Sequence, residues 1–450
     1  MPSLRPSVLP SAMPTIVEVP VVNGTTALFN LIADAAPTGS LPLVQPGTPQ
    51  NRAFRWLSNS TNLETLSDAR RIQRYAMAMF YFSTEGDQWS NSDGWLTDAD
   101  ECTWYSRKLS GSPCDANGTL TELTLGFNNV GGSIPADLPM LSDLLIFSIS
   151  GGPFRFLSGS LPSQLGLLSS LKSFNIRGNL LVGGELPDEL GNLTECEYFD
   201  VTNNRINGPI PVSMGSMRSL QDLFLGMNQL SGVIPSSFGS LELLEQCSLG
   251  LNRLSGPVPS ELGLLTNLQT LSLEQNELSS FPTTIGQLGG LQRFVMYGNN
   301  VTGTLHSELG QLTTLRTLYL YDNNLQGGIP TSLGGMTSLR DLDLSVNRLS
   351  GPIPSELGLL TDLTRLRLHS NLLTGGVPTT FANLTLINEL RLDDNNLTIA
   401  VDESICVAWN ASAPEFRTDC TSTAFPDNEL DCDCCSHCCS DVDGCALVDV

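Results

Sequence analysis

A pattern that recurs along most of the chain constrains the fold more than any other feature. Residues 318–330 read LYLYDNNLQGGIP and residues 342–354 read LDLSVNRLSGPIP, which gives the consensus LxLxxNxLxGxIP. Twelve such units cover about residues 120–400, mostly at a spacing of 24 residues, and a fixed period of this length predicts a solenoid. Gly152 holds the slot of the marker asparagine in one unit, and the others carry Asn128, Asn179, Asn204, Asn228, Asn252, Asn276, Asn299, Asn323, Asn347, Asn371 and Asn395.

Each unit is expected to form one coil of the solenoid. Its LxL segment predicts a short strand with both leucines turned inward, and neighbouring strands are expected to stack into a parallel sheet about 4.8 Å apart. The marker asparagine is expected to enter the coil and bond backbone groups where the strand ends, so that stacked asparagines form a ladder. One unit cannot bury its own apolar face, so its stability depends on its neighbours.

The repeats resemble the plant-type leucine-rich repeat family. Ten units carry the proline of the consensus, while His306 and Ala400 occupy that slot in two others, and the unit that ends in Pro282 lacks the glycine. The resemblance implies an α/β repeat solenoid, a right-handed horseshoe with a parallel concave sheet, a helical N-cap and a Cys-rich C-cap. The ten prolines are Pro135, Pro162, Pro187, Pro211, Pro235, Pro259, Pro282, Pro330, Pro354 and Pro378.

The two ends are expected to cap the solenoid. We expect residues 1–50 to be a Pro/Ser-rich linker, largely disordered, residues 51–119 to form a helical N-terminal cap, and residues 401–450 to form the C-cap and a Cys-rich tail. An apolar stripe predicts a helix over 67–82 with Ser67 as its N-cap. The segments 71–76, 95–96 and 101–105 also resemble diatom leucine-rich-repeat proteins, many of which resemble receptor ectodomains that follow a membrane helix.

The twelve cysteines indicate an oxidising compartment. Cys196 and Cys247 occupy leucine positions of the repeat and are expected to be buried and free. Proximity suggests a disulfide between Cys102 and Cys114, as in the N-cap of the plant-type family. A C-cap disulfide is expected between Cys406 and Cys420, with about three more in the tail; the alternative for the tail is a zinc or copper site that includes His437. The tail cysteines are Cys432, Cys434, Cys435, Cys438, Cys439 and Cys445.

Charge and targeting signals bear on partners and location. The net charge of −24 argues against nucleic acid or an anionic membrane as the main partner. No apolar run is long enough for a membrane helix, and no ordinary signal peptide is evident at the start, so Met1 is hypothesised to be internal to a longer product, with a possible upstream anchor. Glycosylation is expected at Asn117, Asn192, Asn300 and Asn383, and the location is expected to be extracellular or the cell surface.

One group on the expected concave face differs from its surroundings. Most outward positions carry small or polar residues, but Val295, Tyr297, Tyr319 and Tyr321 come from two adjacent coils and are expected to touch. Arg293, Arg316 and His369 are expected to border them. The alternative is that these tyrosines simply stack across strands and stabilise the sheet. A second group, Asp341, Asp343, Arg365, Arg367 and Glu389, is typical of a salt-bridge ladder.

The sequence offers little support for an enzyme. It contains no phosphate loop and no HExxH motif, its three histidines fall in different units, and no cofactor is expected. We therefore expect non-enzymatic recognition of a peptide, protein or glycan by the concave face, in receptor-like signalling or defence. Two other functions remain open: a secreted inhibitor of a foreign hydrolase, and a structural protein of the cell surface or wall.

Overall fold

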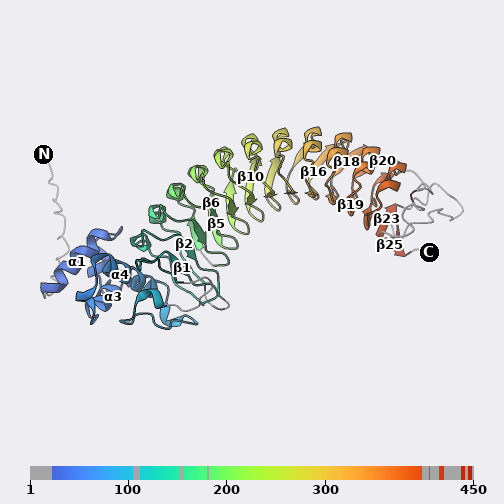
Figure 1. Cartoon of the computed structure of the whole chain (residues 1–450). Coiled ribbons are helices and arrows are strands. Elements are labelled where there is room, and N and C mark those ends of the chain that lie inside the picture. Colours follow the sequence, from blue (N-terminus) through green and yellow to red (C-terminus); the bar gives the residue numbers. More distant parts are fainter. Residues whose placement is uncertain are drawn as a thin grey trace, which may run out of the picture.

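The computed structural model describes residues 23–104, 112–152, 154, 156–179, 182–397, 405, 415–419, 437–440 and 444–447. It is an open arc of stacked coils with a group of helices at its N-terminal end (Figure 1). The predicted solenoid with a parallel concave sheet is confirmed. None of the helices in these residues is long and apolar enough to cross a membrane.

A fifteen-stranded sheet lines the inner side of the arc, parallel throughout except for the last pair, β24 and β25. In the described part of residues 120–397, each of the twelve predicted units contributes one strand. The strands are, in order, β1 (Glu122–Thr124), β2 (Ile146–Ser148), β3 (Ser173–Asn175), β5 (Tyr198–Asp200), β7 (Asp222–Phe224), β9 (Gln246–Ser248), β11 (Thr270–Ser272), β13 (Arg293–Val295), β15 (Thr317–Tyr319), β17 (Asp341–Asp343), β19 (Arg365–Arg367), β21 (Glu389–Arg391), β23 (Glu415–Asp419), β24 (His437–Ser440) and β25 (Gly444–Leu447).

A second row of short parallel strands lies along the side of the coils and forms two separate five-stranded sheets. The first contains β4 (Val182–Glu185), β6 (Arg205–Pro209), β8 (Gln229–Gly232), β10 (Arg253–Pro257) and β12 (Glu277–Ser280). The second contains β14 (Thr302–Thr304), β16 (Asn324–Gly327), β18 (Arg348–Pro352), β20 (Leu372–Gly375) and β22 (Asn396–Leu397).

The row is interrupted between β12 and β14, at the unit that lacks the consensus glycine. In the units before and after it, this glycine has a φ of about +75° to +88°, as at Gly256 and Gly303, and such angles favour glycine. Without it the coil is one residue shorter and β12 and β14 do not pair; the Asn300 N–H, just before β14, donates to the Leu278 carbonyl of β12 at 3.0 Å. His306, in the proline slot of the next unit, places Nε2 3.0 Å from the Phe281 carbonyl oxygen across this break.

Short 3₁₀ turns form the outer side of the arc, and most begin directly after the consensus proline. They are η4 (Leu138–Met140), η5 (Ser163–Leu167), η6 (Asp188–Asn192), η7 (Val212–Ser216), η8 (Ser236–Ser240), η9 (Ser260–Leu264), η10 (Thr283–Gln287), η11 (Ser307–Gln311), η12 (Thr331–Gly335), η13 (Ser355–Leu359) and η14 (Thr379–Asn383).

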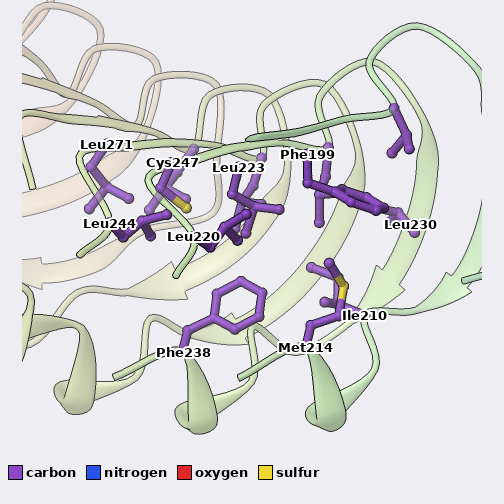
Figure 2. Packing of buried hydrophobic residues seen from close by; sticks show 14 of the residues in the cluster. Phe199, Ile210, Met214, Leu220, Leu223, Leu230, Phe238, Leu244, Cys247 and Leu271 are labelled. Atoms are coloured by element: carbon purple, nitrogen blue, oxygen red, sulfur yellow. The ribbon is translucent and has the colours of Figure 1, made fainter. Parts of the chain in front are cut away.

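The core runs without interruption between the concave strands and the outer turns. The central residue of each strand points into it, so that Phe199, Leu223, Cys247 and Leu271 follow one another on consecutive strands (Figure 2). Each is at most 1% exposed, and burial of a side chain of this size stabilises the fold by about 1.5–3 kcal/mol. The prediction that Cys196 and Cys247 are buried free thiols is confirmed.

The predicted asparagine ladder is also present. Asn276 Oδ1 accepts the backbone N–H of Leu254 at 2.9 Å. Its Nδ2 donates to the Leu273 carbonyl of its own coil at 3.2 Å and to the Leu249 carbonyl of the preceding coil at 3.1 Å. The same three kinds of contact recur at Asn228, Asn252, Asn299, Asn323, Asn347, Asn371 and Asn395.

The N-terminal cap begins earlier than the sequence predicted, because residues 23–50 are folded onto it. The expectation of a largely disordered linker is wrong for these residues, and residues 1–22 lie outside the described part. Ile32 is fully buried in α1, and Asp137 accepts hydrogen bonds from Thr38 and Gln50. The prolines suggested a linker, but Pro49 occupies the first turn of α3, where a helix tolerates proline. The helices are α1 (Asn23–Ala35), α2 (Leu41–Val44), α3 (Pro49–Ser58) and α4 (Asp68–Ser83).

Helix α4 seals the first coils of the solenoid. Ser67 caps it as predicted, accepting the N–H of Arg70, and Phe80 packs edge-on against Phe147 of β2. Cys102 and Cys114 form the expected disulfide, with Cα atoms 5.6 Å apart. Beside it, the buried Arg74 guanidinium lies 3.8 Å from the Glu101 carboxylate. Short turns connect these elements: η1 (Leu63–Thr65), η2 (Gly86–Gln88) and η3 (Glu101–Thr103).

Only part of the Cys-rich C-terminal tail lies among the described residues. Cys438 and Cys439 lie in β24 and Cys445 lies in β25, which extend the concave sheet. The others predicted to form disulfides there, Cys406, Cys420, Cys432, Cys434 and Cys435, lie outside the described residues. Their pairing and the alternative of a metal site in the tail therefore stay predictions.

Candidate functional site

Three tyrosines, Tyr297, Tyr319 and Tyr321, meet on the concave face and are called here the tyrosine cluster. Strands β13 and β15 pair in register, with Val295 opposite Tyr319, so the residues that follow them lie side by side. The Tyr297 and Tyr321 rings stack with centroids 4.3 Å apart and planes 7° from parallel. Tyr319 meets Tyr321 edge-on at 6.2 Å, and all three side chains are partly exposed.

Two arginines hold Tyr319 from opposite sides. The Arg293 guanidinium lies over its ring, 5.6 Å from the centroid, as expected for a residue that borders the cluster. Arg365 Nη2 donates to the Tyr319 hydroxyl at 3.2 Å, from a strand two coils further along. Burial, followed by the Asp341 carboxylate, raises the pKa of Tyr319, and burial followed by Tyr297 raises the pKa of Tyr321. Both hydroxyls therefore stay protonated at neutral pH, and that of Tyr321 already forms a hydrogen bond with Tyr297.

Val295 does not have the place that the sequence predicted. It was expected to contact a ligand, but it is 1% exposed, although it stands outside the continuous leucine core. It faces the concave side between Ser272 and Tyr319 on the neighbouring strands. Its burial leaves no surface for a ligand, so Val295 belongs to the sheet on which the cluster lies.

Arg316 and His369 were also expected to border the cluster. Arg316 instead lines a separate groove at the start of the strands, together with Gln269 and Gln292. His369 is half-buried in the same row as Tyr297 and Tyr321, with Ser345 of the intervening coil between. Its Nδ1 is buried and has no hydrogen-bond partner, and burial, followed by Arg391, lowers its pKa.

The predicted salt-bridge ladder lies next to the cluster. Arg365 pairs with Asp341, and Arg367 bonds Glu389 at 2.7 Å and Asp343 at 3.4 Å. The hydrogen bond from Arg367 lowers the pKa of Glu389. Each of these arginines therefore has a carboxylate partner, and the three carboxylates outnumber the two guanidinium groups by one charge.

Glu274 was not singled out in the sequence, but the structure places it directly beside the cluster. It precedes Tyr297 in the same row. Its carboxylate lies so close to Gly250 that a Cβ on residue 250 would be 2.5 Å from it. Oε2 is buried without a partner, and burial raises the pKa of Glu274 while Arg293 acts in the opposite direction. The only sequence signal was a lone carboxylate among small residues, which is too common to identify a site.

The four predicted glycosylation sites are all exposed and avoid this face. Asn192 ends η6 and Asn383 ends η14, both on the outer side of the arc. Asn300 lies beside the lateral sheets, and Asn117 lies in the loop before β1. Glycans at these positions would leave the tyrosine cluster uncovered.

Comparisons with known proteins give matches along the repeats. A family model described as Leucine-rich repeat region matches residues 248–351. A second, described as Leucine Rich Repeat, matches residues 170–193, 219–241 and 362–384. A search of curated proteins found no match.

Several solved structures are similar. A TDR receptor is 32% identical over 67% of this chain and 52% of its own, with a TM-score of 0.62. The plant peptide hormone receptor RGFR1, in complex with RGF2, is 31% identical over the same shares, with a TM-score of 0.58. A plant ice-binding protein has the same fold, at 24% identity over 73% of this chain and 95% of its own, with a TM-score of 0.55. The chain spans about half the length of the two receptors that it matches.

Proposed function

Because this chain is a leucine-rich-repeat protein of the plant type, we propose that its concave face recognises a peptide, protein or glycan ligand, outside the cell or at its surface. The observation that carries the proposal is the tyrosine cluster, a partly exposed aromatic surface flanked by arginines. Aromatic rings with polar tips and arginine are the residues that most often dominate binding energy at interfaces.

The surroundings of the cluster favour a binding role over a purely structural one. Cross-strand stacking of Tyr297 on Tyr321 does stabilise the sheet, by about 0.2–1 kcal/mol. The leucine column beneath already supplies far larger stabilisation, so the sheet has little need of surface aromatics. In the row of Tyr297 the preceding coils carry Gly226, Gly250 and Glu274, so the stacked rings border a polar surface on this side.

The similar proteins support the class of ligand. RGFR1 is a plant peptide hormone receptor, and its resemblance to this chain favours a peptide among the three ligand classes. The disulfide between Cys102 and Cys114 favours an oxidising compartment, in agreement with an extracellular location. Mass spectrometry of the native protein, reading its N-terminus, glycans and thiols, tests that location; reduced Cys102 and Cys114 together with an absence of glycans would contradict it.

The binding proposal is tested with purified full-length chain and peptide fractions from the medium of its own cells, measured by surface plasmon resonance. Tyr297→Ala with Tyr321→Ala is expected to weaken binding by about 2 kcal/mol or more, roughly 30-fold. The matched control is Tyr198→Ala with Phe224→Ala, an aromatic pair on β5 and β7 of the same face. Unchanged affinity in the first variant, or an equal loss in both, would contradict the assignment.

A further inference from the structure

A polar groove of about 420 Å³ crosses the start of strands β11, β13 and β15, apart from the tyrosine cluster. It exists because one coil lacks side chains that its neighbours carry. Gly289 and Gly290 stand where the preceding coil has Thr266 and Asn267 and the next coil has two threonines. The missing side chains leave an open depression between adjacent coils.

The walls of the groove carry amides and hydroxyls. Gln269 and Gln292 occupy one row on successive coils, and Asn267 faces the same space. Gln269 donates to the Glu245 carboxylate at 2.8 Å, which leaves its amide oxygen free to accept a hydrogen bond. The lining offers donors and acceptors but no pocket for an apolar anchor, which peptide grooves normally provide.

Arg316 and Arg340 continue the same row on the next two coils, where the Arg340 N–H donates to the Arg316 carbonyl at 2.9 Å. Both side chains are exposed, and in the described part of the chain neither forms an ion pair. Asp341 pairs with Arg365, and Asp362 forms no ion pair with Arg340. Arg316 and Arg340 therefore place two positive charges on adjacent coils of a strongly acidic chain, which favours an anion at this place.

We propose that this groove binds an acidic polysaccharide, a hydroxyl-rich chain that carries carboxylate or sulfate groups. Arg316 and Arg340 pair with the acidic groups, and the glutamine and asparagine amides bond the sugar hydroxyls. The chain as a whole has a net charge of −24, which repels such a polysaccharide, so we expect attraction to concentrate where two exposed arginines lie on adjacent coils. The site is independent of the tyrosine cluster and does not depend on the function proposed above.

The test uses the full chain and calorimetric titration at low salt with a galacturonic acid hexasaccharide and a heparin hexasaccharide. A neutral glucose hexasaccharide and a glutamate hexapeptide are run in parallel. We expect at least one acidic sugar to bind, with affinity that falls as salt rises, and the tighter of the two identifies the anion as carboxylate or sulfate. Binding by neither, equal binding of the neutral sugar, or equal binding of the peptide overturns the proposal.

Four variants, two of them controls, locate the site. Arg316→Gln with Arg340→Gln is expected to weaken binding at least about ten-fold, and Gly290→Thr, which fills the groove without changing charge, also weakens it. The matched control, Arg253→Gln with Arg348→Gln, removes two exposed arginines from β10 and β18 and should leave the affinity unchanged. The double tyrosine variant should also bind normally. Unchanged affinity in the first double variant, or equal losses in the control, overturns the assignment.

Discussion

The asparagine ladder allows one prediction to be worked out contact by contact. In Asn276→Ala, the Leu254 N–H loses its acceptor, which costs about 1–3 kcal/mol for a buried donor. The Leu249 and Leu273 carbonyls each keep a second donor, Asn252 and Asn299 respectively, so each lost bond costs only about 0.5–1.5 kcal/mol. The sum is about 2–6 kcal/mol, a large fraction of the stability of an ordinary domain.

The measurement is urea unfolding of the recombinant chain, followed by circular dichroism at 25 °C. Asn276→Asp tests the mechanism at constant size. At pH 7 its carboxylate can accept the Leu254 N–H but would face two carbonyl oxygens at 3.1–3.2 Å, so it should destabilise at least as much as alanine. Asn300→Ala, at an exposed position nearby, is the control and should change stability by less than about 0.5 kcal/mol. An aspartate variant as stable as the wild type would refute the reasoning, because asparagine would then act only by filling space.

Three further predictions concern single sites. Val346 has a φ of +54°, which is a strained conformation for a β-branched residue. Val346→Gly should therefore raise the free energy of unfolding, measured by urea titration, by about 0.5–1 kcal/mol. A less stable variant would contradict the strain. Arg367 lowers the pKa of Glu389 in the folded chain, so the pair stabilises the fold. That stabilisation is fully present above the unfolded pKa of about 4.3 and is lost as pH falls through the lower folded pKa. Melting temperatures of Arg367→Gln should therefore fall less steeply in acid than those of the wild type, and parallel curves would disprove the linkage. Burial raises the pKa of Cys196 and of Cys247 to about 12, so both thiols should resist iodoacetamide until urea unfolds the chain, and rapid labelling of the native protein would contradict their burial.

The periodicity of the repeats predicts the fold correctly, whereas the composition of the N-terminal segment predicts a linker where the structure has helices. Leucine and asparagine spacing specifies the strands and the ladder because each coil repeats the same contacts. The prolines of residues 23–50 favour a linker by composition, but Pro49 begins a helix and the segment is folded. Local composition does not show which distant surface a segment packs on, and Asp137, which binds this segment, lies far along the chain.

The candidate site was predictable in outline only. Strand register alone brings Tyr297 beside Tyr321. It also places Arg293 on the strand next to that of Tyr319. Side-chain reach does not follow from register: Arg365 crosses two coils to reach Tyr319, and Val295 is covered by its larger neighbours. The groove beside Arg316 could not be seen as a motif, because it consists of side chains that are missing from one coil.

The interruption between β12 and β14 has a mechanical consequence. In a linear array each coil is held only by its neighbours, so the array yields first where that coupling is weakest. At this joint the concave strands β11 and β13 remain paired, while β12 and β14 at the side of the array do not pair. We therefore expect the array to bend most readily at this joint, where the concave sheet and the Asn299 hydrogen bonds continue but the lateral sheet does not. The groove spans the same two coils, so an occupant is expected to restrain this bending.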